Sequence, residues 1–260
     1  MTVDSLENAL ASFERETAAA VKGLSAALRE VKKLQAAAAH GQMRDLRNGL
    51  DTTSRLADQA ADTVRDLRGA WTFDEAEYFA NGSFAKEVLA LGEAEDLRAV
   101  ESDERILSFP VIVQISAGDT TVAIDKVRER RVRPSLLVRR LKALQASPPR
   151  FKAEPFLEAL AAAYDLSLAS AGLRPGSVTR VVELYAVLTL MPGAAREYTK
   201  QEFARDLYLL DQSAVVTCRD GRTLAFPASA LTRAGATLST VTRAGQPKIY
   251  AGISFTKASQ

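Results

Sequence analysis

The residues best suited to chemistry in this chain form a cluster of cations between residues 126 and 152. This segment holds ten Lys and Arg residues against one acidic residue, Glu129, so its net charge is +9. Seven of the ten are arginines, whose planar guanidinium groups bind phosphate through two parallel hydrogen bonds and stack on bases. A cluster of this density is typical of a surface that holds a nucleic-acid backbone.

The charge pattern therefore predicts a nucleic-acid site, with duplex DNA contacted through its backbone as the expected ligand. The expected binding residues are Lys126, Arg128, Arg130, Arg131, Arg133, Arg139, Arg140, Lys142, Arg205, Arg219 and Arg222. Two alternatives remain open. The cluster could pair with the acidic segment 71–104 or with an acidic partner protein, or it could be a solvated face. The net charge of the whole chain, +2, hides this contrast, because residues 71–125 carry −9.

The composition argues against most classes of enzyme. The chain has one histidine, His40, and one cysteine, Cys218, which excludes a His- or Cys-rich zinc site and a disulfide within one chain. The sequence contains no Walker phosphate loop, no dinucleotide-binding glycine motif and no G-x-S-x-G elbow. Asp119, Asp125 and Lys126 are the only candidates for a metal-dependent nuclease near the cluster, but their spacing is unusual and Asp119 fits a turn. We expect no catalytic residue, no metal and no cofactor.

The elements that position these residues begin with a helical segment over residues 1–70. Two apolar series recur there at alternating steps of four and three residues, as in helices that bury a narrow stripe against another helix. The break at His40–Gly41 predicts a coiled-coil hairpin, and one long helix that pairs with another chain is the alternative. The expected partner interface comprises Leu6, Leu10, Phe13, Leu24, Val31, Leu46, Leu50, Val64 and Leu67.

Residues 71–172 are expected to form a central module. Acidic residues dominate 71–104, where we expect short helices. The β-branched residues of Ile106–Ser116 and the alternation over Thr120–Asp125 indicate two strands joined by a turn. Two helices within 134–170 complete this module, and the Gly- and Pro-containing segment 172–176 has the composition of a linker.

Residues 177–260 are expected to form a C-terminal module. One helix is predicted over about 178–191, and a second begins at the capping box Thr199-Lys-Gln-Glu202. The predicted strands are Ala214–Cys218, Thr223–Pro227, Thr237–Thr242 and Lys248–Phe255.

This order of helix, turn, helix, strand, turn and strand resembles a winged helix. In DNA-reading versions of that fold the second helix enters the major groove. Here that helix carries Lys200 and Arg205 but also Glu202 and Asp206, and acidic side chains near phosphate lower affinity. The order is also similar to that of the small winged-helix subunits that clamp onto partners in chromosome-organising complexes, which implies a protein-docking role.

The chain is thus expected to be α+β, with a helical coiled-coil hairpin, a central module and a winged-helix-like module. The N-terminus has no signal peptide and no window is apolar enough to span a membrane, so a cytoplasmic location is expected. The leading hypothesis is a non-catalytic nucleic-acid-binding accessory subunit that oligomerises or recruits another protein through its coiled coil. The alternatives are an adaptor in a chromosome-organising or genome-defence complex and a winged-helix transcription regulator.

Overall fold

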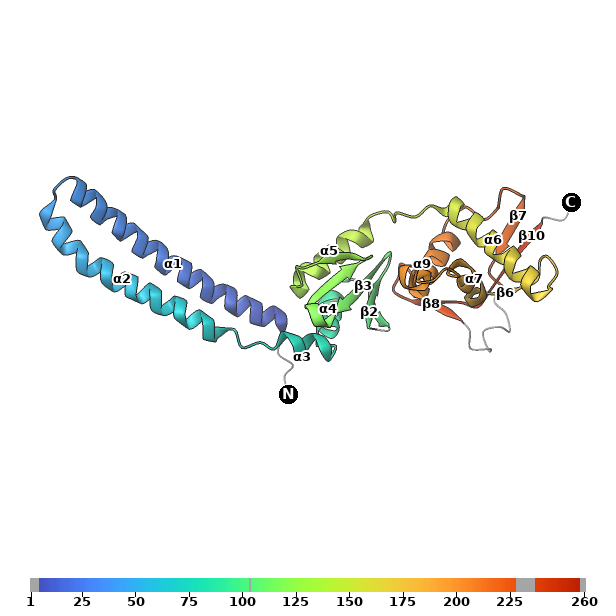
Figure 1. Cartoon of the computed structure of the whole chain (residues 1–260), viewed down its shortest axis with the longest axis horizontal. Helices are drawn as coiled ribbons and strands as arrows, with labels where there is room; N and C mark the ends of the chain where they lie inside the picture. Colours follow the sequence, from blue (N-terminus) through green and yellow to red (C-terminus); the bar gives the residue numbers. More distant parts are fainter. Residues whose placement is uncertain (1–4, 103, 228–236, 258–260) are drawn as a thin grey trace.

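The computed structural model describes residues 5–102, 104–227 and 237–257. Over these residues the chain is α+β, and its parts follow one another along a long axis (Figure 1). A helical hairpin forms one end, a helix-covered sheet the middle and a C-terminal module the other end. None of the described helices has the length and apolar character needed to cross a membrane.

The N-terminal hairpin consists of α1 (Leu6–Ala39) and α2 (Met43–Ala70). The chain turns back at His40–Gly41, where Gly41 adopts a φ of 66°. Glycine reaches this left-handed conformation without steric cost, which is why it so often follows the last turn of a helix. Residues 6–70 therefore form two antiparallel helices and not one long helix (Figure 1).

Small residues line the contact between α1 and α2. The buried positions beyond the base of the hairpin are the alanines Ala20, Ala27, Ala37 and Ala60. Gly23 faces Ala60 so closely that a methyl group added to the glycine would lie 3.8 Å from the alanine Cβ. The two helices therefore approach each other more closely than a seam of leucines would allow.

The nine residues predicted to form a partner interface take two kinds of position in the hairpin. Five of them are buried or half-buried: Leu6, Leu10, Phe13, Leu46 and Leu67. The other four, Leu24, Val31, Leu50 and Val64, lie exposed on the flank of the hairpin. A seam of alanine and glycine leaves no room for these larger side chains, which the heptad spacing alone does not reveal.

The central module is an antiparallel meander with helices packed against one face. Its strands follow chain order: β1 (Val100–Ser102), β2 (Arg105–Ser108), β3 (Val111–Ser116), β4 (Thr121–Ile124) and β5 (Val127–Glu129). A 3₁₀ turn at Ala117–Asp119 joins β3 to β4. The covering helices are α3 (Glu75–Ala80), α4 (Ser83–Ala94) and α5 (Pro134–Ala146). The predicted strand Ile106–Ser116 is in fact two strands, because Pro110 has no N–H to continue the ladder.

A carboxylate from α4 holds the start of α1. Glu87 accepts hydrogen bonds from the backbone N–H groups of Leu6 and Glu7, at 2.9 and 3.1 Å. It also accepts from the hydroxyl groups of Ser5 and Tyr78. The first N–H groups of a helix lack partners within the helix and carry partial positive charge, so a carboxylate placed there is stabilising.

Glu7 makes the corresponding contact with α5. Its carboxylate accepts from the N–H of Ser135 at 3.0 Å and from Arg133 at 2.7 Å, and Glu14 accepts from the same guanidinium at 2.7 Å. Burial alone would raise the pKa of Glu7, but the hydrogen bonds from Ser135 and Arg133 outweigh it and hold the pKa below its usual value. The base of the hairpin is thus fixed to both α4 and α5.

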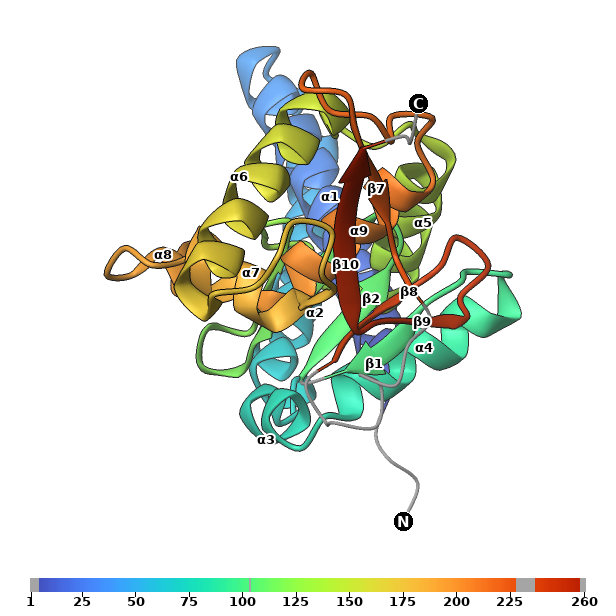
Figure 2. The ribbon, with the colours of Figure 1, turned by 90° about the vertical axis from the view of Figure 1, so that its right-hand side faces the viewer.

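The C-terminal module gathers its helices around one apolar core. These helices are α6 (Ala153–Ala171), α7 (Val181–Leu188), α8 (Ala194–Glu197) and α9 (Lys200–Asp211). In its three-stranded sheet, β10 (Gly252–Lys257) lies between β6 (Thr179–Arg180) and β7 (Arg222–Ala225). Figure 2 looks along the long axis and shows β10 beside β7, with α6 and α7 to the left. A separate hairpin pairs β8 (Leu238–Val241) with β9 (Pro247–Tyr250).

The structure changes three predicted boundaries. Helix α6, which was predicted as part of the central module, packs in one apolar core with α7 and α9, and the segment 147–152 that precedes it has neither helix nor strand. The predicted helix 178–191 starts as β6 and becomes helical only at Val181. The predicted strand Ala214–Cys218 is reduced to one bridge at Thr217, and β10 supplies the main partner of β7.

Replacing Glu87 with Gln should loosen the start of α1. The amide keeps the shape of the side chain but loses the charge that faces two N–H groups. We expect the free energy of unfolding to fall by about 1 to 3 kcal/mol, and hydrogen exchange in the first turn of α1 to accelerate. Glu93→Gln, at an exposed position of the same helix, is the control. Equal losses in both variants would contradict the capping role.

Gly23→Ala should stabilise the hairpin by up to about 1 kcal/mol, because alanine is favoured over glycine inside a helix. Its new Cβ would make an ordinary contact with Ala60. Gly49→Ala is the matched control, because it gains the same propensity but places its Cβ 2.7 Å from Cδ2 of Leu34. Thermal unfolding followed by circular dichroism measures both. An equal gain in thermal stability at the two positions would contradict the close contact between position 49 and Leu34.

Candidate functional site

The central and C-terminal modules meet through an apolar contact flanked by ion pairs. Phe109 packs edge-to-face against Tyr208 of α9, with ring centroids 5.2 Å apart. Arg205 of α9 lies 2.8 Å from Asp125, in the turn between β4 and β5. Next to it, Lys126 lies 3.0 Å from Glu202. These contacts fix α9 against the central sheet.

Neighbouring groups shift the pKa values of the charged side chains in this contact. Burial alone would raise the pKa of Glu202, but hydrogen bonds from the Thr199 backbone and from Lys126 outweigh it and lower the pKa. Burial would likewise lower the pKa of Arg205, but the nearby charges of Asp206 and Asp125 raise it. Glu202 and Arg205 are therefore both charged at neutral pH.

This docking corrects the role predicted for Arg205. From Gln201 to Asp211, every residue of α9 is buried or half-buried. The Arg205 guanidinium lies between Asp125 and Asp206 and is not presented to solvent. A helix that enters the major groove must offer one free face to the bases, and α9 has none.

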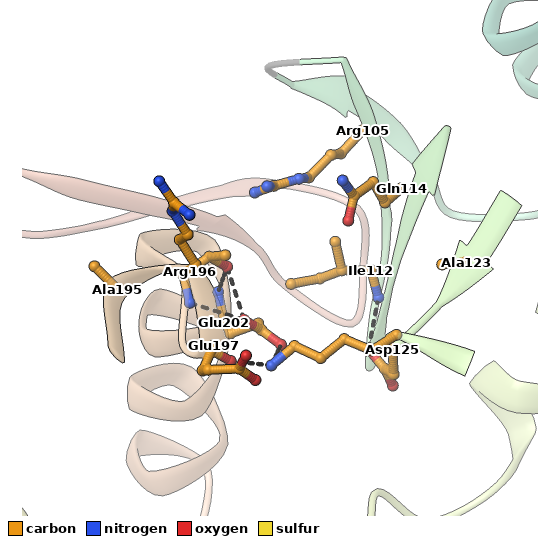
Figure 3. A pocket seen from close by; sticks show the side chains of 11 residues that line it. Arg105, Ile112, Gln114, Ala123, Asp125, Ala195, Arg196, Glu197 and Glu202 are labelled. Atoms are coloured by element: carbon orange, nitrogen blue, oxygen red, sulfur yellow. Dashed lines mark hydrogen bonds and ion pairs between the residues drawn. The ribbon is translucent and has the colours of Figure 1, made fainter. Parts of the chain in front are cut away.

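A cleft of about 420 Å³ opens beside the contact, between the open face of the sheet and the segment from α8 to α9 (Figure 3). Arg105 and Gln114 project from the sheet, and Arg196 projects from α8 toward the same opening. The ion pair of Lys126 with Glu202 borders the cleft. Within the described residues, neither Arg105 nor Arg196 forms an ion pair. Two guanidinium groups and an amide thus line the cleft together with the carboxylates of Asp125, Glu197 and Glu202.

Strand pairing connects the cleft to the basic segment. Arg105 of β2 pairs with Gln114 of β3, and Gln114 pairs with Ala123 of β4. Ala123 pairs in turn with Arg128 of β5. Adjacent strands lie about 4.8 Å apart, so this row spans roughly 14 Å. The sequence reasoning missed Arg105 and Arg196 because each is an isolated cation, and only the correct strand register brings Arg105 into line with Arg128.

The eleven predicted nucleic-acid residues fall into two groups. Four are tied to other elements: Arg133, Arg205 and Arg222 are half-buried in ion pairs, and Lys126 is exposed but pairs with Glu202 of α9. The other seven are exposed, some of them with ion pairs of their own: Arg128, Arg130, Arg131, Arg139, Arg140, Lys142 and Arg219. Arg219 lies in the turn before β7, whereas the other six lie on β5, on α5 or between them. We call these six residues the basic surface.

Carboxylates neutralise part of the basic surface. Glu129 lies between Arg131 and Arg140, at 2.9 and 3.7 Å. Hydrogen bonds from Arg131 lower the pKa of Glu129 to about 2. Two longer contacts join Arg128 to Asp119 at 3.4 Å and Lys142 to Glu95 at 3.6 Å. Six exposed cations therefore face three carboxylates.

Among the described residues, one ion pair joins the basic segment to the acidic segment 71–104, that of Lys142 with Glu95. The acidic partners of Arg133, Arg205 and Lys126 come from α1, from the β4–β5 turn and from α9. Arg130 and Arg139 form no ion pair with any described residue. The basic surface thus keeps an excess of positive charge.

The residues considered for a nuclease have other contacts. Asp119 pairs with Arg128, Asp125 with Arg205, and Lys126 with Glu202. In the described ranges, no three His, Cys, Asp or Glu side chains gather closely enough to hold a metal ion. Cys218 is buried in the C-terminal core.

No protein-family model matches the chain, and the comparisons with curated proteins and with solved structures give no match. Function has therefore to be inferred from the geometry of the chain itself.

Replacing Arg205 with Ala should loosen the contact between the modules, because Asp125 and Asp206 would lose the cation they share. We expect the free energy of unfolding to fall by about 1 to 3 kcal/mol, and proteases to cleave the segment 147–152 faster. Arg196→Ala removes an arginine from the neighbouring cleft without breaking an ion pair among the described residues and is the control. If the two variants are cleaved at the same rate, the ion pairs of Arg205 do not hold the modules together.

Proposed function

We propose that this protein is a non-catalytic nucleic-acid-binding accessory subunit that holds duplex DNA through its phosphate backbone. The observation that supports this proposal is the excess of cations on the basic surface. Arg130 and Arg139 have no carboxylate partner in the described chain, and Arg131 and Arg140 share one. Guanidinium groups with free N–H donors contact phosphate oxygens readily. The row from Arg128 to Arg105 offers further donors across the sheet.

Binding of this kind depends on charge and not on base sequence. Phosphate contacts release the counterions condensed on DNA, which supplies affinity but carries no sequence information. Base reading requires an element that fits a groove, and α9 is buried in the C-terminal core with Arg205 paired to the central sheet. We therefore expect equal affinity for unrelated duplexes.

In this proposal the hairpin is a coiled coil and the C-terminal module is a winged helix. The order α7, α9 and β7 supports the second assignment, although β10 occupies the place beside β7 that the adjacent strand would normally take. The second helix of the module, α9, then serves to join the two modules. A transcription regulator that reads bases with this helix has no support from its position.

A second candidate function is that of an adaptor subunit in a multiprotein complex of the chromosome-organising or genome-defence kind. The exposed apolar side chains on the hairpin, among them Leu24, Val31 and Leu50, favour it, because contiguous exposed apolar residues mark surfaces that bind other proteins. The two functions are compatible, since the hairpin and the basic surface lie on different elements.

Duplex binding should fall steeply with salt and should be lost when Arg130, Arg131, Arg139 and Arg140 are all changed to Glu. If the six cations of the basic surface contact phosphates, affinity falls about a thousandfold between 50 and 200 mM salt. Fluorescence anisotropy with two unrelated duplexes measures both the salt dependence and the absence of sequence preference. Arg133 stays unchanged in this variant, because it holds the base of the hairpin.

The matched control changes four exposed cations elsewhere to Glu: Arg55, Lys86, Arg174 and Lys257. It alters the net charge by the same amount and should keep most of the affinity. Equal losses in the two variants would mean that overall charge, and not the basic surface, holds DNA. Absence of wild-type binding at low salt would remove the proposal and leave the adaptor function.

A further inference from the structure

One flank of the helical hairpin is apolar and exposed. It carries Val21, Leu24, Leu28 and Val31 on α1, and Leu50, Ala57 and Val64 on α2. The six larger side chains are between 42% and 62% exposed. We call these seven residues the apolar face. An uncovered row of this kind is unusual for a protein that acts as a monomer.

The two rows of the apolar face lie on the same side of the hairpin. Each residue of a helix is turned by about 100° from the one before, so Leu24 follows buried Ala20 in the same rotational sense as Val64 follows buried Ala60. Because the two helices are antiparallel and face each other, this shared sense places both rows on one side. A hollow on the opposite side is lined by largely polar groups, among them Lys33, Asp45 and Thr52.

The apolar face is symmetric about its own centre. Gly23 faces Ala60 and Leu34 faces Gly49, so the numbers of facing residues add up to 83 in both cases. By the same rule, Ala57 lies level with residue 26 of α1, midway between Leu24 and Leu28.

A two-fold axis through this centre would bring matching side chains together. On α1, Val21 would meet Val31 of the second copy and Leu24 would meet Leu28. On α2, Leu50 would meet Val64 and Ala57 would meet itself, where its small side chain lets the helices approach. Self-complementarity of this kind is what an isologous interface requires.

We propose that the apolar face pairs with the same face of a second copy, so that two hairpins form an antiparallel four-helix bundle. This inference rests on the recruiting role proposed for the hairpin and extends it by naming the partner, a second copy of the chain. The base of the hairpin favours the antiparallel direction. Glu7 and Glu14 precede Val21 and Leu28 at seven-residue intervals and bind Arg133, so the start of α5 covers the same flank near the base. An antiparallel second copy keeps its own globular part at the far end.

The size of the apolar face indicates a weak dimer. The face extends over about 14 residues, or roughly 21 Å of helix, and is two helices wide, which gives a footprint of roughly 400 Å² per copy. A standard interface buries about 800 Å² per partner. We therefore expect a monomer–dimer equilibrium in the micromolar range.

Sedimentation equilibrium of the full chain without nucleic acid tests the proposal. The wild type should dimerise in the micromolar range. The double variant Leu24→Glu and Leu28→Glu should remain monomeric with unchanged helix content, because both positions are exposed. The matched control, Ala19→Glu with Ala36→Glu, adds the same charges to exposed positions of α1 outside the face and should still dimerise.

A cysteine at the predicted axis gives a second readout. A short bis-maleimide should join two copies of the Ala57→Cys variant but not of an Ala19→Cys variant, and Cys218 is buried in both. A wild type that stays monomeric at all concentrations, an unchanged dimer in the Leu24 and Leu28 variant, or equal cross-linking of the two cysteine variants would each overturn the proposal. No DNA is present, so the outcome is separate from that of the DNA-binding test.

Discussion

The attachment of the hairpin depends on carboxylates placed at two helix N-termini. Glu87 of α4 binds the N–H groups that begin α1, and Glu7 of α1 binds the N–H of Ser135 at the start of α5. Helix α1 has 34 residues, so it extends about 51 Å. Apart from its packing against α2, its contacts with the described chain lie mainly in its first turns. The direction of this long element is therefore set by a few hydrogen bonds to charged groups, which are stronger than hydrogen bonds between neutral groups.

Ion pairs between elements also divide the basic segment into two parts with different roles. Arg133 and Lys126 form ion pairs with Glu7, Glu14 and Glu202 of other elements. Arg130 and Arg139 are exposed and have no ion-pair partner among the described residues. The basic segment thus contacts α1 and α9 and still leaves positive charge for a ligand. Because removal of Arg133 or Lys126 leaves carboxylates of other elements unpaired, Arg130 and Arg139 are the cations whose change should leave the fold intact.

The sequence predicts which helices and strands form better than it predicts which of them pack against each other. Helices with a turn at His40–Gly41, the capping box at Thr199 and the turn after β3 all follow from local chemistry. The seam of the hairpin does not, because alanine and glycine at Gly23 and Ala60 bring the helices closer than a heptad of leucines suggests. The cleft lined by Arg105 and Arg196 depends on strand register and on the docking of α9. Both are long-range properties, and for that reason Arg105 and Arg196 could not be found from spacing alone.

The position of β10 also governs the order in which the chain acquires its structure during synthesis. Strand β6 ends at Arg180, yet its partner begins only at Gly252. At about 5 to 20 residues per second, translation of the intervening chain takes several seconds, whereas helices and β-hairpins form in microseconds. The helical hairpin and the β1–β5 meander are complete long before that moment. The C-terminal sheet forms later, because its outer strands β6 and β7 are synthesised before β10, the strand that lies between them.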